Sequence, residues 1–279
     1  MGTADPPGTG DPLGGEAPQR RLAPDGAGLQ PGPAEDARLQ PQVPPDTAGG
    51  RPSPAPDTAD LPRAPPGAGL AAVRVVAVTD RARMVPPHVL DAGDWSAIAA
   101  AFGAAVERAV AGCAAGSVVV QVREKDLDGG PLLQLVRAAQ LFAPITVNDR
   151  LDVALAAGAW GVHLPERGLA VADARGLAAG LAVGTSRHAA PGETGADLVQ
   201  LGPIWATPSK PTAAPLGEAA LAAPHGSARL VAVGGIDTPA RANAAAAAGA
   251  DAVAVIRAAW TGGSLAPFVA AVDAGRARR

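Results

Sequence analysis

The chain has 279 residues, a formal net charge of −3 and one cysteine. A single cysteine excludes a disulfide framework and a cluster of thiolate zinc ligands. A near-neutral charge argues against a nucleic-acid-binding protein. No uncharged apolar stretch reaches the roughly 18 residues of a membrane span, and the first residues show neither the basic start nor the apolar run of a secretory signal. We therefore expect a soluble cytoplasmic protein.

Residues 1–69 differ in composition from the rest of the chain. They hold 16 of the 29 prolines and 12 of the 35 glycines, and no aromatic residue. Five arginines face nine acidic residues there, a net charge of −4. Such a segment cannot bury enough apolar surface to offset the entropy lost on ordering. We predict a disordered low-complexity tail over residues 1–69 and a single folded domain over residues 70–279.

Beyond residue 70, short apolar runs rich in β-branched residues alternate with alanine-rich helical segments. We expect strands at 73–79, 117–122, 145–147, 161–164, 181–184, 198–201, 230–233 and 251–256. We expect helices at 95–111, from Pro131 onward, and at 151–157, 170–179, 218–222, 239–248 and 265–274, with only a short connection after the fifth strand. Buried parallel strands are continuous apolar runs. Eight such units predict an α/β fold, a (β/α)₈ TIM barrel, over a doubly wound open sheet, which usually has about five or six strands.

In such a barrel the chemistry lies on the loops at the carboxyl ends of the strands. Unusual polar residues follow most of the predicted strands. They are Thr79 and Asp80, Arg123 to Lys125, Asn148 and Asp149, Ser186 to His188, Thr207 to Lys210, and Gly234 with Gly235. Lys125 and Lys210 are the only lysines of the chain. Because both fall on this face, we expect a site for an anionic ligand there.

The cations and the glycines each have two interpretations. Arg123 and Lys125 favour binding of a phosphate or carboxylate, although an isolated charge run of this kind is often only solvated. Gly234 and Gly235 would let backbone N–H groups approach a phosphate, or would only form a tight turn.

The titratable candidates are also open to two interpretations. His188, after a Gly-Thr-Ser turn, can transfer protons near neutral pH, whereas His163 is expected to be a packed core residue. Asp149 is either a ligand or the cap of the helix that starts at Leu151. His88 and His225 fall in predicted loops, and the histidines do not have the spacing of a zinc site.

Six motifs, in order between about residues 75 and 259, resemble the thiamine phosphate synthase and thiazole tautomerase (TenI) family. They are VQVREK, VNDRLDVALAAGAWGVHLPERG, GTSRH, GADLVQLGPIWATPSK, VAVGGI and AGADAVAVI. The resemblance implies a (β/α)₈ barrel and one of two activities in thiamine biosynthesis. A synthase joins hydroxymethylpyrimidine diphosphate to thiazole phosphate with Mg²⁺. A tautomerase shifts a proton on a carboxylated thiazole phosphate so that the ring becomes aromatic, and needs no metal.

The resemblance also separates the two activities. Synthases of this family carry one Mg²⁺-binding aspartate after the third strand and a second five residues beyond the histidine that ends the fourth. Here these positions are Asp149 and Gly168. The proline after His-Leu and the TPSK string also resemble tautomerases. We therefore expect a tautomerase without a metal cofactor. The alternatives are a synthase with Asp149 on Mg²⁺, and a non-catalytic barrel that binds a thiamine precursor.

On the tautomerase interpretation, the resemblance assigns proton transfer to His188. It places the small-molecule thiazole phosphate against Arg123, Lys125, Asn148, Ser186, Thr207, Lys210, Gly234 and Gly235. Family members usually have a small serine-containing turn after the eighth strand, where this chain has Arg257 and Ala258. The sequence leaves open whether the barrel forms a homo-oligomer.

Overall fold

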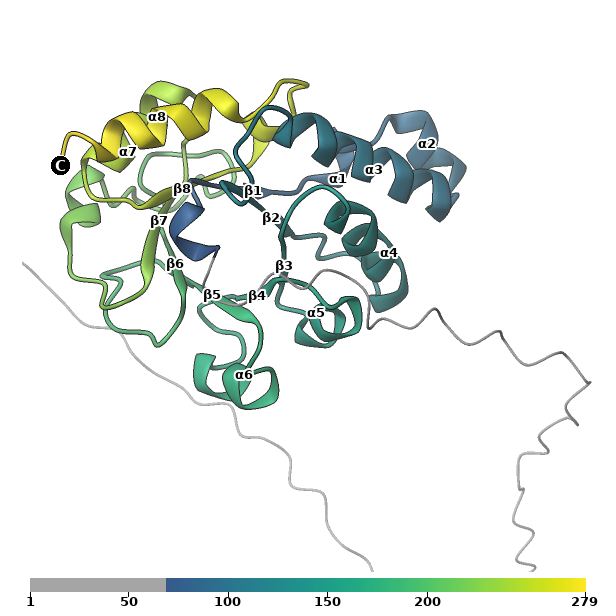
Figure 1. The fold of residues 1–279 in the computed structure, drawn as a ribbon, viewed down its shortest axis with the longest axis horizontal. Helices are drawn as coiled ribbons and strands as arrows, with labels where there is room; N and C mark the ends of the chain where they lie inside the picture. Colours follow the sequence, from purple (N-terminus) through teal and green to yellow (C-terminus); the bar gives the residue numbers. More distant parts are fainter. Residues whose placement is uncertain (1–68) are drawn as a thin grey trace, which may run out of the picture. The chain divides into compact units, whose positions relative to one another are not determined.

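A computed structural model describes residues 69–279, so the disordered tail expected over residues 1–69 lies outside the described residues except for Gly69. In the described part, parallel strands close into a barrel in which β1 pairs with both β2 and β8 (Figure 1). The strands are β1 (Val75–Val78), β2 (Val118–Val122), β3 (Ile145–Asn148), β4 (Gly161–Leu164), β5 (Ala182–Arg187), β6 (Leu198–Leu201), β7 (Arg229–Val233) and β8 (Ala252–Val255). The predicted (β/α)₈ barrel is confirmed, and the doubly wound sheet is excluded.

Helices surround the barrel (Figure 1). The α-helices are α1 (Arg81–Met84), α2 (Pro87–Ala92), α3 (Trp95–Val110), α4 (Gly129–Gln140), α5 (Leu151–Ala157), α6 (Val171–Leu177), α7 (Pro239–Ala247) and α8 (Ala266–Arg276). Short 3₁₀ helices are η2 (Leu70–Ala72), η3 (Glu218–Ala222) and η4 (Arg257–Trp260). Within residues 69–279, no helix has both the length and the apolar character needed to cross a membrane.

Three sequence predictions need correction. The short helices α1 and α2 were not expected, and His88 lies in α2 rather than in a loop. The segment 218–222 is a 3₁₀ helix, not an α-helix. β5 runs on to Arg187, because Ser186 and Arg187 continue the pairing with β6. Ser186 therefore lies in a strand and not in a turn.

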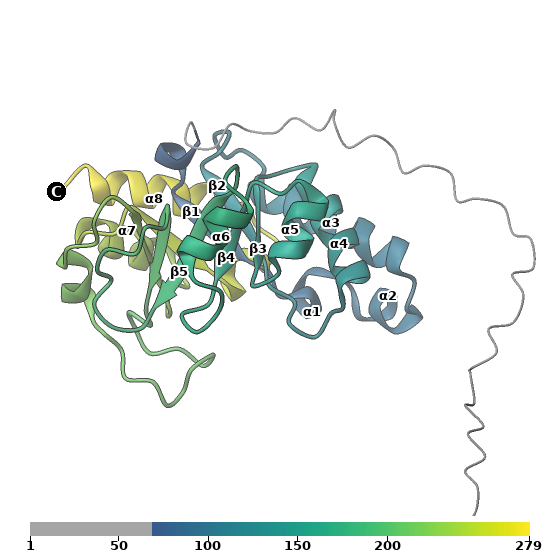
Figure 2. The same cartoon turned by 90° about the horizontal axis from the view of Figure 1, so that it is seen from below.

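The apolar core has two layers, because side chains alternate between the inside and the outside of a barrel strand. Outside, Phe102 of α3 and Leu135 of α4 are completely buried against the strands. Inside, Val76, Leu198 and other strand residues form a separate cluster. Leu70 of η2 packs against this inner cluster, and Figure 2 shows η2, in dark blue, at one end of the barrel, with α1 toward the other.

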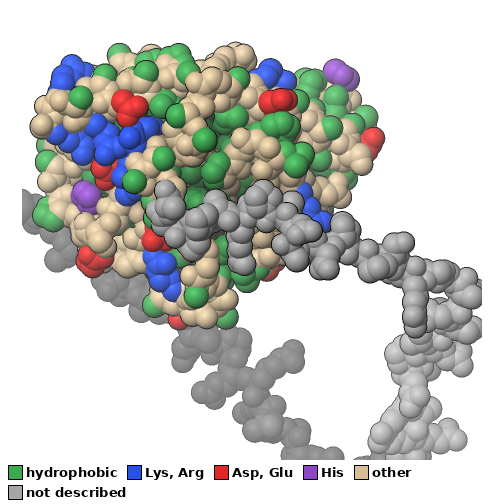
Figure 3. Space-filling view, viewed as in Figure 1, with side chains coloured by type: hydrophobic (Ala, Val, Ile, Leu, Met, Phe, Trp, Pro, Cys, Tyr) green, Lys and Arg blue, Asp and Glu red, His purple; other side chains and the backbone are tan. Residues whose placement is uncertain are grey.

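Basic side chains gather over the α7–α8 region on the face shown in Figure 3. Burial lowers the pKa of Arg229 against the opposing charge of Asp251, and the nearby charges of Arg276, Arg74 and Arg279 lower it further. Arg74 forms an ion pair with Asp273 of α8, and its guanidinium also donates to the carbonyl of Ala71. Arg74 thus joins α8 to the segment before β1, and Arg229 donates to the carbonyl of Val73 in the same segment, so these two arginines serve the fold.

Toward the carboxyl ends of the strands, polar side chains replace apolar ones inside the barrel. Gln200 donates to Gln121 Oε1 at 2.6 Å, and Gln121 Nε2 donates to Asn148 Oδ1 at 3.1 Å. The ring Nε2 of His163 lies 2.8 Å from Ser186 Oγ. These contacts join five strands and satisfy polar atoms that would otherwise be costly to bury. They form a polar layer above the apolar filling of the barrel.

His163 makes this layer sensitive to acid. Burial, and secondly the charge of Arg123, lowers the pKa of His163 from 6.5 to about 3. The unfolded chain therefore binds a proton at a pH where the folded protein does not. Above about pH 6.5 this histidine does not reduce the free energy of unfolding. As the pH falls from there toward 3, protonation of His163 in the unfolded chain lowers the free energy of unfolding by up to about 1.4 kcal/mol per pH unit.

We predict that His163→Gln, which keeps a polar partner for Ser186, reduces the dependence of unfolding free energy on pH between about pH 6.5 and pH 4. Urea unfolding at several pH values measures this slope. His88→Gln is the matched control, since His88 is exposed in α2 and lies outside the polar layer. Equal slopes in the wild type and His163→Gln would contradict the prediction.

Candidate active site

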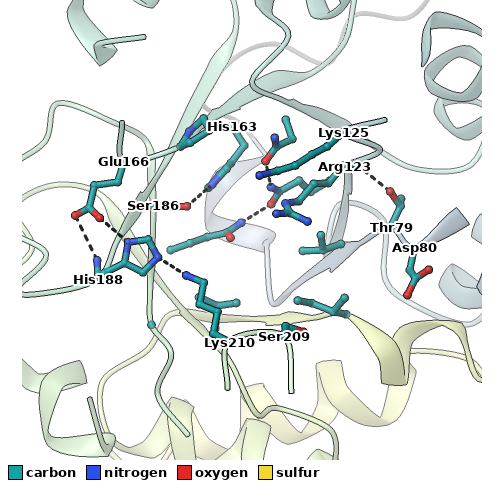
Figure 4. A pocket seen from close by; sticks show the side chains of 18 of the residues that line it. Thr79, Asp80, Arg123, Lys125, His163, Glu166, Ser186, His188, Ser209 and Lys210 are labelled. Atoms are coloured by element: carbon teal, nitrogen blue, oxygen red, sulfur yellow. Dashed lines mark hydrogen bonds and ion pairs between the residues drawn. The ribbon is translucent and has the colours of Figure 1, made fainter. Parts of the chain in front are cut away.

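A cavity of about 550 Å³ opens at the carboxyl ends of the strands (Figure 4). Its volume lies in the range of roughly 300–1,000 Å³ that is usual for small-molecule sites. The polar layer of the barrel forms part of its wall through Gln121, Asn148, His163 and Gln200. The remaining polar lining comes mainly from the strand ends and loops that follow β1, β2, β4, β5 and β6. It consists of Thr79, Asp80, Arg123, Glu124, Lys125, Glu166, Ser186, Arg187, His188, Ser209 and Lys210.

Glu124 ties the loop after β1 to the loop after β2. Its carboxylate accepts from Thr79 Oγ1 at 2.6 Å and from the backbone N–H of Arg81 at 3.1 Å. Thr79 Oγ1 in turn accepts from the backbone N–H of Arg123 at 2.9 Å. The Glu124 side chain is only 7% exposed, and burial raises its pKa against the opposing effects of Thr79 and Arg81. These contacts hold the backbone that presents Arg123 and Lys125 to the cavity.

The cavity carries an excess of positive charge. Arg123, Lys125, Arg187 and Lys210 all line it, and among residues 69–279 none of the four forms an ion pair with a carboxylate. The carboxylates of the lining are each in contact with another group: Asp80 with Arg83 at 3.0 Å, Glu124 with Thr79 and Arg81, and Glu166 with His188. A pocket with free cations and occupied carboxylates favours an anionic ligand.

Three titratable side chains from successive loops meet at one side of the cavity. His188 Nδ1 lies 2.5 Å from Glu166 Oε2, and His188 Nε2 contacts Lys210 Nζ (Figure 4). The hydrogen bond from His188 lowers the pKa of Glu166. Burial lowers the pKa of Lys210, with smaller contributions from Arg123 and Lys125 in the same direction and from Glu166 against them. A histidine between an acid and a lysine is suited to moving protons.

The diglycine after β7 lies in a second, smaller cavity of about 30 Å³. Thr207, Gly234 and Gly235 line it together with Arg257 and Ala258 of η4, and it shares Ser209 and Ile256 with the large cavity. Gly234 has φ 97° and Gly235 has φ 72°. A Cβ on Gly235 would lie 2.7 Å from Trp205 Cβ. The tight-turn interpretation thus accounts for both glycines by itself, and phosphate binding there remains a prediction.

The two positions at which the resemblance places the magnesium ligands of synthases, Asp149 and Gly168, are neighbours in space, but only one of them carries a carboxylate. A Cβ on Gly168 would lie 3.1 Å from Asp149 Oδ1 and 2.9 Å from Cδ of Pro165. A side chain at Gly168 would therefore require the proline ring to shift. Glu166, the carboxylate two residues before Gly168, is hydrogen-bonded to His188. Magnesium is usually held by one or two carboxylates with substrate oxygens, and in residues 69–279 no group of three or more His, Cys, Asp or Glu side chains is placed to hold a metal.

Asp149 itself has an unusual backbone. Its φ is 65°, and no other non-glycine residue between 69 and 279 has a positive φ. The N-cap of α5 is Arg150, so the interpretation of Asp149 as a helix cap is wrong. Asp149 does not line the large cavity, in contrast to Asn148 beside it. Left-handed backbone in a non-glycine residue is often retained at functional positions.

The structure divides the predicted site residues into two groups. Arg123, Lys125, Asn148, Ser186, His188 and Lys210 line the large cavity, and Thr207, Gly234 and Gly235 line the small one. His163 is buried, as expected, yet it also reaches the cavity wall.

Sequence reasoning missed Gln121, Gln200 and the contact of Glu166 with His188. The two glutamines carry a usable signal, since each is a lone polar residue in an otherwise apolar strand. Glu166 has no comparable signal, because only the fold places it beside His188.

The chain matches the family model described as thiamine monophosphate synthase over residues 92–259. A thiamine-phosphate synthase from Chloroflexus aurantiacus is 41% identical over 172 residues, which is 56% of this chain and 76% of the relative. One from Anaeromyxobacter dehalogenans is 42% identical over 194 residues, 62% of this chain and 86% of the relative. A Geobacter sulfurreducens relative is 46% identical over 118 residues, 38% of this chain and only 54% of its own length.

Among solved structures, thiamine phosphate pyrophosphorylase from Pyrococcus furiosus is similar, with a TM-score of 0.49 and 24% identity. The match covers 75% of this chain and 96% of that one. The two relatives named above as synthases agree with the alternative activity, so the comparisons do not confirm the expected tautomerase. They do confirm the resemblance drawn from the motifs: this chain belongs to the thiamine monophosphate synthase family of enzymes.

Proposed function

We propose that the chain is a thiazole phosphate tautomerase, which aromatises a carboxylated thiazole phosphate by moving one proton. The observation that carries this proposal is the contact of Glu166, His188 and Lys210 at the edge of a cationic cavity. The reaction removes a proton from a ring carbon and delivers a proton to the exocyclic carbon, so it needs a base and an acid but no net proton. General acid–base catalysis of this kind contributes roughly 10²–10⁴-fold.

The cations of the cavity suit the two anionic groups of this substrate. Arg123 and Lys125 come from the loop that Glu124 holds, and Lys210 faces them from the loop after β6. A carboxylate bound among these cations would be stabilised as negative charge develops on the ring during proton loss. The phosphate would lie toward the small cavity, against the backbone of Gly234 and Gly235.

The second candidate is a thiamine-phosphate synthase, favoured by the names of the relatives and by the presence of Asp149. Family synthases depend on Mg²⁺. In this chain Pro165 and Gly168 leave Asp149 without a second free carboxylate, so the donors do not fit a two-carboxylate site and we assign no step to the metal. A third candidate is a barrel that binds a thiamine precursor without turnover.

Assays with both substrate sets distinguish the three candidates. We predict that the full chain aromatises the carboxylated thiazole phosphate in a buffer with a metal chelator, followed by the ultraviolet absorption of the product. Release of diphosphate from hydroxymethylpyrimidine diphosphate and thiazole phosphate, only with added Mg²⁺ and without any aromatisation, would replace the proposal by the synthase. Saturable binding of thiazole phosphate with neither reaction would indicate the binding protein.

His188→Gln should separate proton transfer from binding. We predict that kcat for aromatisation falls by about 10²–10⁴-fold while KM changes little, because the ring transfers a proton and contributes little of the binding energy. His225→Gln is the control, since His225 lies outside the cavity and contacts the Ala228 carbonyl. Unchanged kcat in His188→Gln would contradict the assignment.

Lys125→Met should change KM rather than kcat. Its ammonium lines the cavity, and loss of one ion pair to a bound anion is expected to raise KM by about tenfold, or roughly 1.4 kcal/mol. Initial rates over a range of substrate concentrations measure the change. A wild-type KM would show that Lys125 does not contact the substrate.

A further inference from the structure

We propose that Glu166 is the positioning residue for His188, and that it holds the imidazole in the tautomer with the proton on Nδ1 and the lone pair of Nε2 facing Lys210. The consequence for turnover rests on the proposed tautomerase, whereas the tautomer is a property of the free protein. Nothing in the motif pattern assigns a role to Glu166, which lies in the loop after β4.

Glu166 fixes the proton on one side of the histidine ring. The hydrogen bond from His188 lowers the pKa of this carboxyl, with a smaller effect from Arg187, so the group is ionised at neutral pH. An ionised carboxylate can only accept hydrogen bonds. At 2.5 Å from Oε2, the ring Nδ1 must therefore donate. The other oxygen, Oε1, accepts from the backbone N–H of His188 at 3.4 Å, which pins the same residue twice.

Lys210 fixes the lone pair on the opposite side of the ring. Nε2 contacts Lys210 Nζ, and an ammonium group has three donors and no acceptor. Nε2 must then accept. Both neighbours thus require the same tautomer, one from the loop after β4 and one from the loop after β6 (Figure 4).

The arrangement also provides a route for a proton. Lys210 can pass a proton from Nζ to Nε2, which leaves a neutral amine and an imidazolium whose charge faces the Glu166 carboxylate. Three surrounding features make the lysine a better donor: its burial, Arg123 and Lys125, while Glu166 acts against them. A carboxylate that orients a histidine and stabilises its charged form is a recurring device in acid–base catalysis.

The ion pair of His188 with Glu166 is expected to contribute little to the stability of the fold. The side chains of His188 and Glu166 are 43% and 36% exposed, and ion pairs at such exposure contribute little to stability. Removal of the Glu166 carboxylate should therefore leave the fold intact and change the tautomer of His188. This makes the two roles separable by experiment.

The test compares Glu166→Ala with the wild type, with Glu166→Asp as the conservative variant and Glu107→Ala as the control. Glu107 is an exposed glutamate of α3, away from the cavity lining. The ¹⁵N chemical shifts of the histidine rings in the free full chain report the tautomer. Only four histidines are present, so a His188→Gln spectrum assigns the signal of His188.

We predict the Nδ1–H tautomer in the wild type, in Glu107→Ala and in Glu166→Asp, and a large Nε2–H population in Glu166→Ala. In turnover, Glu166→Ala should lower kcat by up to about 10²-fold with little change in KM, because Glu166 acts through His188. Glu166→Asp should restore part of the loss, and the unfolding midpoints of all variants should match.

The outcomes separate this inference from the proposed function. The Nδ1–H tautomer in Glu166→Ala, or a wild-type kcat in that variant, overturns the role of Glu166 even if the wild type is an active tautomerase. If the wild type shows no aromatisation, the tautomer comparison alone decides the positioning role. If the tautomer of His188 then changes on loss of Glu166, Glu166 positions His188, and the protein catalyses a reaction other than aromatisation.

Discussion

Closure of the sheet is the constraint on which the site depends. Because β1 pairs with β8, the carboxyl ends of all the strands face one opening. Glu166, His188 and Lys210 follow three consecutive strands, β4 to β6, and meet within hydrogen-bond reach. The Thr79–Glu124 bond connects β1 to β2 in the same way on the opposite side of the cavity (Figure 4). Loops without regular structure are thereby held by the rigid strands beneath them.

The balance of charge inside the cavity follows from pairing rather than from composition. The lining has acidic as well as basic side chains, and a count of residues would suggest little net field. The structure shows that Glu124 faces Thr79 and Arg81 of the neighbouring loop, that Asp80 faces Arg83 of its own segment, and that Glu166 faces His188. Arg123, Lys125 and Lys210 are left facing the cavity, which explains how a chain with a net charge of −3 offers a site for anions.

One short loop decides whether a second carboxylate can lie beside Asp149. It contains Pro165, Glu166 and Gly168. The proline ring lies beside Gly168, and the glutamate contacts His188, which follows β5. One loop can supply a carboxylate to a cation beside Asp149 or to the imidazole of His188, but the same carboxylate cannot do both at once. If the proposed function holds, this competition would distinguish the chain from the relatives that are named as synthases.

The sequence by itself determined the barrel, because eight apolar runs separated by helical segments have few other ways to bury their surface. It also determined which strand ends carry the scarce lysines, His188 and the diglycine, because polar residues at the end of an apolar run mark a loop. The sequence did not predict where β5 ends, because the polar residues Ser186 and Arg187 extend the strand by pairing with β6. Only the tertiary structure decided that Glu166 contacts His188, that Glu124 is buried, and that Pro165 blocks a side chain at Gly168. The first two depend on distances between loops that are far apart along the chain, and the third depends on how the backbone of a single loop bends; no local sequence pattern encodes either.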